Sequence, residues 1–133
     1  MAILDFHLDS RSGVSYYVQL INQARQAVQF GILRAGDQLA TVREVVAAVA
    51  VNPNTVLRAY RDLEHEGLVV SRPCLGTFVA DGAPAPIDQP LYRSLREDLE
   101  RWIRAARGHG VDDRTLAALF EHVLRDIPEE ITA

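Results

Sequence analysis

Apolar residues near the N-terminus follow two different periods. Leu4, Phe6 and Leu8 alternate with polar residues, which predicts a short half-buried strand. From residue 17 onward, apolar residues recur instead at spacings of three and four, the period of one helix face. This stripe consists of Tyr17, Leu20, Ile21, Ala24 and Val28. Because Gly31 then provides a C-terminal stop signal, we expect a first helix over residues 15–30.

Two helix-start signals lie close together in the middle of the chain. Thr41 and Glu44 match a capping box, in which each side chain accepts a hydrogen bond from the other residue's backbone amide. Asn52 is a good N-cap, and Pro53 takes the first helical position, where its missing N–H costs nothing. A helix is therefore predicted to begin at each signal. The apolar stripe of the later helix consists of Val56, Ala59, Tyr60 and Leu63.

Two short runs rich in β-branched and aromatic residues come next. Residues 68–71 and 77–80 flank the segment 72–76, which contains a proline and a glycine. This pattern predicts a β-hairpin with a five-residue loop. Two helices joined by a short turn and followed directly by a hairpin form a winged helix-turn-helix.

Residues 81–90 contain three prolines and one glycine and show no apolar period, which predicts a linker. The chain then divides into a winged helix-turn-helix DNA-binding domain over 1–80, this linker, and a two-helix region over 91–133. The expected fold class is mainly α, with the α+β character that the hairpin adds.

The region beyond the linker has two amphipathic helices. The first is ended by Gly108 and Gly110, and the second begins at Asp112 and ends before Pro128. A pair of helices this short cannot bury both apolar stripes by itself. We therefore expect these stripes to form a dimer interface, with contacts from Leu95, Leu99, Trp102, Ile103, Phe120, Val123 and Leu124.

Composition excludes several classes of protein. The single cysteine, Cys74, rules out an intramolecular disulfide, and the four histidines have none of the spacings of a zinc site or a catalytic triad. We expect no catalytic residue, no metal ion and no cofactor. A redox role for Cys74 stays open, although a small side chain on a turn is the favoured interpretation. Since the chain has neither a long apolar run nor a leader pattern, we expect a cytoplasmic protein without a membrane partner.

Charge is distributed unevenly. The chain of 133 residues has a formal net charge of −4, which by itself argues against a nucleic-acid partner. Residues 1–80 contain seven Arg and seven acidic residues, whereas residues 81–133 contain seven Arg and eleven acidic residues. The negative surplus therefore lies outside the predicted winged helix-turn-helix.

The outer face of the helix that begins at Asn52 carries groups that can read DNA. These groups are Asn54, Thr55, Arg58 and Arg61. An Arg guanidinium can bind guanine through two hydrogen bonds, Asn can bind adenine in the same way, and Thr can reach a phosphate or a thymine methyl group. A solvated polar face is the alternative, and the adjoining turn and hairpin favour DNA binding.

Three further residues fit contacts to the DNA backbone. Arg43 lies in the first turn of the preceding helix, where a guanidinium and a helix N-terminus together suit a phosphate. Arg72 and Thr77 flank the hairpin loop, from which they can reach the backbone or the minor groove.

Several motifs occur in one order along residues 5–80. They include Ser15–Leu20, Gly31–Leu39, Thr41-Val42-Arg43, Asn52-Pro53-Asn54-Thr55-Val56, Ala59-Tyr60 and Gly76-Thr77-Phe78-Val79. Together they resemble the GntR family of bacterial transcription factors, and the recognition-helix start with only two helices in the tail is similar to its YtrA-like subfamily. The resemblance implies DNA contacts by Arg43 and by the start of the recognition helix, at Asn52, Asn54, Thr55 and Arg58. It also implies a dimerising tail without a large effector-binding domain.

The chain departs from the family pattern at a few positions. Three prolines are replaced, by Ser15, Ala35 and Ala40, which removes rigidity without changing the expected fold. The wing motif Gly-x-Gly-Thr-Phe begins here with Cys74 in place of its first glycine, which affects the wing turn.

These observations predict a homodimeric transcription regulator, a repressor, that binds double-stranded operator DNA with inverted-repeat symmetry and associates with the nucleoid when bound. The alternative is a winged-helix module for protein contacts, which would show no salt-dependent DNA binding. A small-molecule effector stays unassigned. The resemblance suggests regulation of a transporter operon by analogy alone.

Overall fold

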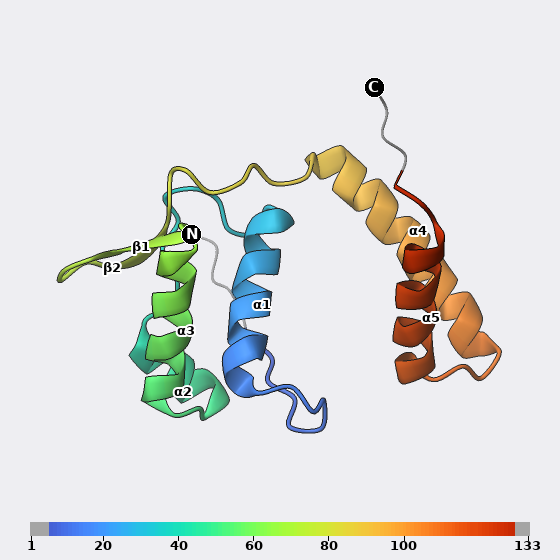
Figure 1. The fold of residues 1–133 in the computed structure, drawn as a ribbon, viewed down its shortest axis with the longest axis horizontal. Helices are drawn as coiled ribbons and strands as arrows, with labels where there is room; N and C mark the ends of the chain where they lie inside the picture. The colour runs from blue at the N-terminus through green and yellow to red at the C-terminus, as the bar shows by residue number, and fades with distance from the viewer. Residues whose placement is uncertain (1–5, 130–133) are drawn as a thin grey trace. The chain divides into compact units, whose positions relative to one another are not determined.

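Within residues 6–129, which the computed structural model describes, the chain forms five helices and one hairpin (Figure 1). In order these are α1 Tyr16–Gln29, α2 Val42–Val49, α3 Pro53–His65, β1 Val69–Arg72, β2 Gly76–Val79, α4 Gln89–Gly108 and α5 Asp113–Asp126. They divide into two compact units, Met1–Gln89 and Pro90–Ala133, called here the head and the tail. The predicted fold class, mainly α with a winged helix-turn-helix, is confirmed.

The core of the head forms where α1 and α2 pack against α3. The apolar positions predicted to face inward on α1 and α3 are buried, apart from Tyr17, which is half-buried at the edge. The largest fully buried side chains come from all parts of the head: Leu20, Leu33, Val45, Val56, Leu63 and Val79. Because one face of α3 is held this way, its opposite face is left for solvent or a ligand.

Side-chain caps fix the helix boundaries, and those at Thr41 and Asn52 were predicted. Ser15 caps α1, and Thr41 and Glu44 form the expected capping box at α2. The Asn52 side chain accepts a hydrogen bond from the Asn54 amide at 2.8 Å, with Pro53 at the first position of α3. Each signal satisfies backbone amides that the first helical turn leaves unpaired, which explains why the boundaries agree with the sequence.

The predicted N-terminal strand is wrong for the part that the structure describes. Phe6 is buried and Leu8 half-buried, yet residues 6–9 form no strand, and Leu4 lies outside the described residues. The backbone N–H and C=O of residue 7 are bound by the Gln23 side-chain amide at 2.9 and 2.6 Å, and those of residue 9 by the Gln19 amide at 2.8 and 2.9 Å. Two glutamines one helical turn apart thus take the place of a neighbouring strand.

The wing is an antiparallel hairpin with a shorter loop than predicted. Val69 pairs with Val79, and the ladder continues to a pair between Arg72 and Gly76. Because that last pair closes the ladder, the loop has only residues 73–75 instead of the expected 72–76. The segment before α2 adds one isolated bridge, between Gln38 and Phe78, which anchors the wing to the head.

The segment predicted as a linker, residues 81–90, is docked at its C-terminal end. The Ile87 amide donates to the Gln29 carbonyl at 3.0 Å, and the Gln89 side chain donates to the Phe30 carbonyl at 3.2 Å. Helix α4 begins at Gln89, before the predicted end of the linker. The end of this segment is therefore part of the head and lies against the C-terminal end of α1.

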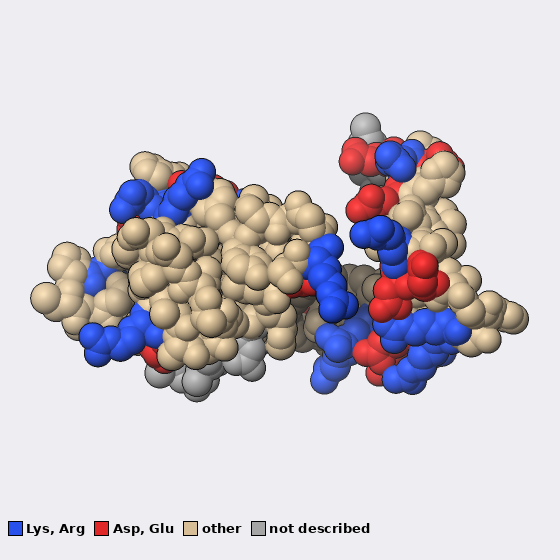
Figure 2. Space-filling model, turned by 90° about the horizontal axis from the view of Figure 1, so that it is seen from below, with Lys and Arg blue, Asp and Glu red and all other residues tan. Residues whose placement is uncertain are grey.

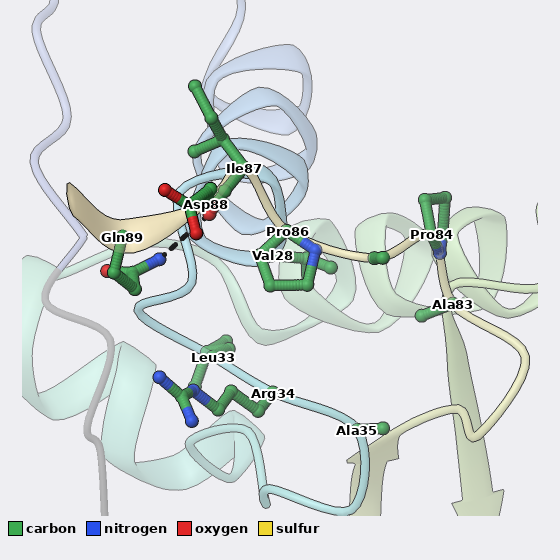
Figure 3. A pocket seen from close by; sticks show the side chains of 11 residues that line it. Val28, Leu33, Arg34, Ala35, Ala83, Pro84, Pro86, Ile87, Asp88 and Gln89 are labelled. Atoms are coloured by element: carbon green, nitrogen blue, oxygen red, sulfur yellow. Dashed lines mark hydrogen bonds between the residues drawn. The ribbon is translucent and has the colours of Figure 1, made fainter. Parts of the chain in front are cut away.

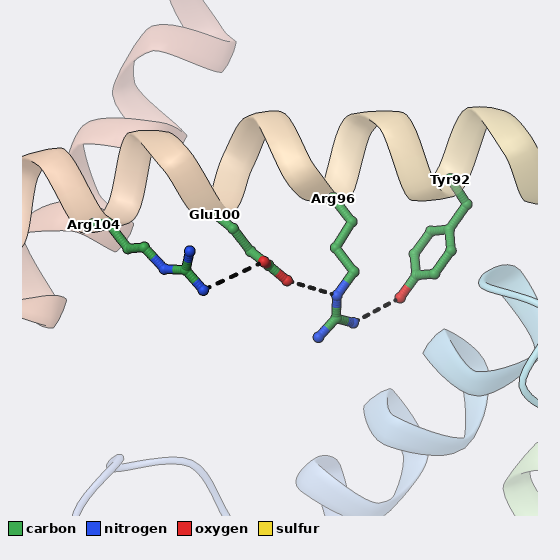
Figure 4. A network of polar contacts seen from close by, with 4 residues as sticks. All are labelled: Tyr92, Arg96, Glu100 and Arg104. Atoms are coloured by element: carbon green, nitrogen blue, oxygen red, sulfur yellow. Dashed lines mark hydrogen bonds and ion pairs between the residues drawn. The ribbon is translucent and has the colours of Figure 1, made fainter.

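The tail consists of α4 from residue 90 onward and α5. The Arg107 guanidinium on α4 makes two hydrogen bonds to the Asp113 carboxylate at the start of α5, at 2.9 and 3.0 Å. Leu116 is the one buried residue among those that the structure describes on these two helices. A row of polar contacts runs along one side of α4, from Tyr92 through Arg96 and Glu100 to Arg104 (Figure 4). None of the described helices is apolar enough over a sufficient length to span a membrane.

We expect Ala50→Gly to stabilise the protein. Ala50 ends α2 with φ 52° and ψ 44°, a left-handed conformation in which a Cβ costs about 1 kcal/mol. Removing that Cβ should raise the free energy of unfolding by a similar amount, measured by urea denaturation.

The matched control is Ala48→Gly. Ala48 is an exposed residue inside α2, so this change should destabilise by about 1 kcal/mol. Equal losses for both variants would show that no left-handed strain exists at the turn.

Candidate nucleic-acid interface

The residues predicted to contact DNA lie on the start of α3, the start of α2 and the wing, but they do not form one continuous row. Asn54 is exposed, whereas Thr55 is half-buried. The Asn52 side-chain oxygen is engaged as the N-cap of α3, so its first role is to shape the helix start.

A hollow of about 170 Å³ lies between α3, the start of α2 and the wing. Its lining consists of Val42, Leu57, Tyr60, Arg61, Glu64, Ser71 and Thr77. We call it the wing hollow. Two of the predicted residues, Arg61 and Thr77, are brought together here from elements that lie well apart in the sequence.

Sequence reasoning missed Leu57. Its side chain is 45% exposed and lies in the wing hollow, outside the apolar stripe of α3. The available signal was its position, three residues after Asn54 and four before Arg61, which places all three toward the same side of a helix. An exposed aliphatic group at this place is suited to a thymine methyl group.

Arg58 points toward the opposite edge of α3. Its guanidinium carbon lies 4.0 Å from the centre of the Tyr17 ring on α1, a cation–π contact. The side chain is exposed but held to one side of the helix, away from the wing hollow. Its predicted role in base reading stays a prediction, and this position also suits a phosphate of the DNA backbone.

Three carboxylates near this surface have hydrogen-bond or ion-pair partners within the head. Glu44 belongs to the capping box, Glu64 accepts from the Ser71 amide at 2.6 Å, and Glu66 pairs with Arg25 at 2.6 Å. Arg43 and Arg61 are exposed, and neither forms an ion pair within residues 6–129. On the face drawn in Figure 2, blue side chains lie at the wing end of the head with little red beside them.

The wing tip keeps a tight turn without the family's first glycine. Cys74 itself adopts the left-handed conformation, with φ 63°. Gly76 has φ 124°, and a Cβ there would lie 2.6 Å from the Gln38 amide nitrogen. The Gln38 side chain also donates to the Leu75 carbonyl at 3.2 Å, which ties the tip to the segment before α2. Beside it, the Arg72 guanidinium lies 5.2 Å from the Phe78 ring centre.

Tyr60 fixes α3 to the segment before α2. Its hydroxyl donates to the Ala40 carbonyl at 2.6 Å, directly before the cap of α2. Burial raises the pKa of Tyr60, and the charge of Glu44 raises it further, so the hydroxyl stays protonated and able to donate. No cluster that could hold a metal ion occurs within the described part of the chain.

The tail presents a second candidate surface, which is apolar. Six of the seven residues predicted for dimerisation are exposed, among them Trp102 at 37%, Phe120 at 49% and Leu124 at 62%, and Ile103 is half-buried. Two hollows follow this surface, one of about 400 Å³ between α4 and α5 and one of about 220 Å³ beside Trp102 and Ile127. An apolar patch of this kind is typical of an interaction site.

Comparisons with known proteins agree with this geometry. The family model described as "Bacterial regulatory proteins, gntR family" matches residues 16–79. The HTH-type transcriptional repressor YtrA of Bacillus subtilis (strain 168) is 31% identical, over 90% of this chain and 92% of its own. A solved structure described as YtrA from Sulfolobus acidocaldarius, a GntR-family transcription factor, is similar with a TM-score of 0.55 and 26% identity, covering 75% of this chain and 98% of that one. AraR(DBD) in complex with operator ORX1 gives a TM-score of 0.50 and 26% identity, over 59% of this chain and 94% of its own.

We expect Tyr60→Phe to lower the free energy of unfolding by about 1 kcal/mol, because the Ala40 carbonyl loses its donor. Urea denaturation at neutral pH measures this change. Tyr16→Phe is the control, since Tyr16 is exposed and its hydroxyl makes no hydrogen bond to any residue within 6–129. A Tyr60→Phe variant as stable as the control would mean that the hydrogen bond contributes nothing.

Proposed function

The chain belongs to the GntR family of bacterial regulatory proteins, and from this premise we propose that it is a homodimeric repressor that binds an inverted-repeat operator. It is a winged-helix, DNA-binding regulator of transcription, as its relatives are named transcriptional regulators and not enzymes. Two features support the proposal together. The head has an exposed face of α3 with Asn54, Leu57 and Arg61, called here the reading face, and the tail has an exposed apolar face.

In the proposed complex, α3 enters the major groove with Asn54, Leu57 and Arg61 toward the base edges. Arg61 and Leu57 line one hollow beside the wing, so they approach neighbouring base pairs from the same side of the helix. Arg suits guanine, and the Leu57 methyl groups suit a thymine methyl group. Because Thr55 is half-buried, we place it at the edge of the contact between α3 and DNA.

Phosphates are assigned to the arginines around this centre. Arg43 lies in the first turn of α2, where the helix N-terminus adds to its positive charge. Arg58 lies on the edge of α3 that faces α1, and Arg72 with Thr77 lies on the wing. Such contacts fix the register of α3 on the duplex and carry no sequence information of their own.

The tail face supports the homodimer. It is made of large aliphatic and aromatic side chains on two helices, and these side chains are exposed where α4 and α5 pack on each other. Packing the same pair of helices from a second copy would close a four-helix arrangement with two-fold symmetry. Two heads related by such symmetry match half-sites about 34 Å apart on one face of B-DNA, which is the reason to expect an inverted repeat. A repressor of this kind acts at the nucleoid, where its operator lies.

We expect Arg61→Ala and Arg58→Ala to have different effects on DNA binding, the first on sequence preference and the second on affinity for all sequences. Loss of Arg61 should cost about 1–3 kcal/mol on the operator and relax the preference at one base position. Loss of Arg58 should weaken binding to all sequences alike and reduce the slope of log affinity against log salt by about one. Selection of bound fragments from a random library, followed by affinity measurements over a salt series, tests both.

Arg11→Gln provides the control, because Arg11 is exposed in the loop before α1 and is not among the residues assigned to DNA. If Arg58→Ala relaxed a base preference and Arg61→Ala did not, the assignment of the two edges of α3 would be reversed. Binding that is insensitive to salt for the unchanged protein would favour the alternative of a protein-contact module.

For assembly we expect Leu99→Asp to separate the dimer. A charge placed on the apolar face removes the burial of one large side chain, worth about 1.5–3 kcal/mol, and adds the cost of a buried carboxylate. The dimer dissociation constant should rise by about a hundredfold or more, measured by sedimentation. Affinity for the full operator should fall, while affinity for a single half-site stays unchanged.

Ser94→Asp introduces the same charge on the polar side of α4, where Ser94 is exposed, and should leave assembly unchanged. An unchanged protein that sediments as a monomer at micromolar concentration would refute the proposed homodimer.

A further inference from the structure

A second hollow of the head shares no lining residue with the wing hollow. Residues 83–89, called here the strap, pass over the end of α1 and the start of the loop that follows it (Figure 3). The strap and the rest of the head border an open hollow of about 470 Å³, a size usual for small-molecule sites. Beneath the strap it is lined by Val28, Leu33, Arg34 and Ala35. We call it the strap hollow.

The strap is held at both ends, so the hollow is a built feature of the head. At the near end the Ala83 amide donates to the Ala80 carbonyl at 3.1 Å, and Ala83 packs against the core. At the far end the hydrogen bonds from Ile87 and Gln89 reach the last turn of α1 and its cap. A Cβ at Gly31, which has φ 77°, would collide with the Gln89 amide, so glycine permits this close approach.

The chemistry of the strap hollow is that of a site for an organic anion. Its walls are mostly aliphatic side chains and prolines, and Asp88 and Gln89 complete the lining. Arg34 is the one residue with a positive charge among those that line it. The Arg34 backbone amide donates to the Asp37 side chain at 2.9 Å. Among the residues that the structure describes, no carboxylate lies within ion-pairing distance of the Arg34 guanidinium. Figure 3 shows the Arg34 and Gln89 side chains on the same side of the hollow.

We propose that the strap hollow binds a small organic carboxylate, with the carboxylate on Arg34 and an apolar body against Val28, Leu33 and Pro86. Charge-assisted hydrogen bonds from a guanidinium give such a ligand its orientation, and the apolar walls give it area to bury. Asp88 also lines the hollow and makes an interaction within the protein, and Arg34 is the lining residue whose charge attracts a carboxylate.

The position of the strap suggests what such a ligand does, and this step rests on the proposed function. Gln89 is both the anchor of the strap and the first residue of α4, the helix that continues into the tail. A ligand that touches the strap and the 33–35 loop together favours the docked strap over an undocked one. Since the tail joins the two heads of the proposed dimer, ligand binding and operator binding become coupled.

The test uses the full chain and hexanoate as the probe, with hexanamide as its neutral counterpart. Backbone amide signals in a ¹H–¹⁵N NMR titration should shift at residues 33–35 and in the strap, with an affinity near millimolar for so small a molecule. Hexanamide should bind about tenfold more weakly or worse, and Arg34→Gln should remove that preference for the anion. Arg11→Gln, an exposed arginine elsewhere on the head, should bind hexanoate normally.

Each other outcome overturns a defined part of the proposal. Shifts absent below about 10 mM hexanoate, or equal for both probes, overturn the anion site. With hexanoate saturating, affinity for operator fragments should change about fivefold or more, and an unchanged affinity overturns the coupling. The hexanoate titration is independent of whether the protein binds DNA. The coupling result is compared with the affinity for the same fragments without hexanoate, so a failure of DNA binding itself is seen separately.

Discussion

Burial of one face of α3 is the interaction on which the rest of the head depends. Val56 and Leu63 are fully buried against α1 and α2, and the Tyr60 hydroxyl fixes the same helix to the Ala40 carbonyl. A helix held on one side by packing and by a hydrogen bond cannot rotate about its axis. The outward positions of α3 are therefore set by the core, and Asn54 and Arg61 occupy them as a consequence of where the apolar residues lie.

The sequence was most informative where one residue has one strong local effect. The caps at Thr41 and Asn52 agree with the structure because a side chain that satisfies an unpaired amide acts within a single turn. The predicted strand failed for a non-local reason, since side-chain amides from α1 replaced a strand partner that periodicity alone had implied. The docked strap was missed for the same kind of reason, because its hydrogen bonds reach back to α1.

The candidate site shows the same division. Its arginines could be placed on the correct elements from spacing, but the edge of α3 that each one faces depends on a neighbour in another element. Tyr17 draws Arg58 toward α1, and the wing leaves Leu57 and Arg61 in a shared hollow. A helical wheel places Arg58 and Arg61 both outward, so only the tertiary contacts separate a candidate base reader from a candidate phosphate contact.

A net charge of −4 is compatible with DNA binding because charges act locally at the ionic strength of a cell. The carboxylates nearest the reading face are held by caps, a backbone amide and Arg25, whereas the acidic surplus belongs to residues beyond 80. One head with a few arginines gains modest affinity, most of it from phosphates that every sequence offers. Discrimination between sequences then requires two heads on one duplex, and the large uncovered apolar side chains of the tail are the feature of this chain that can join them.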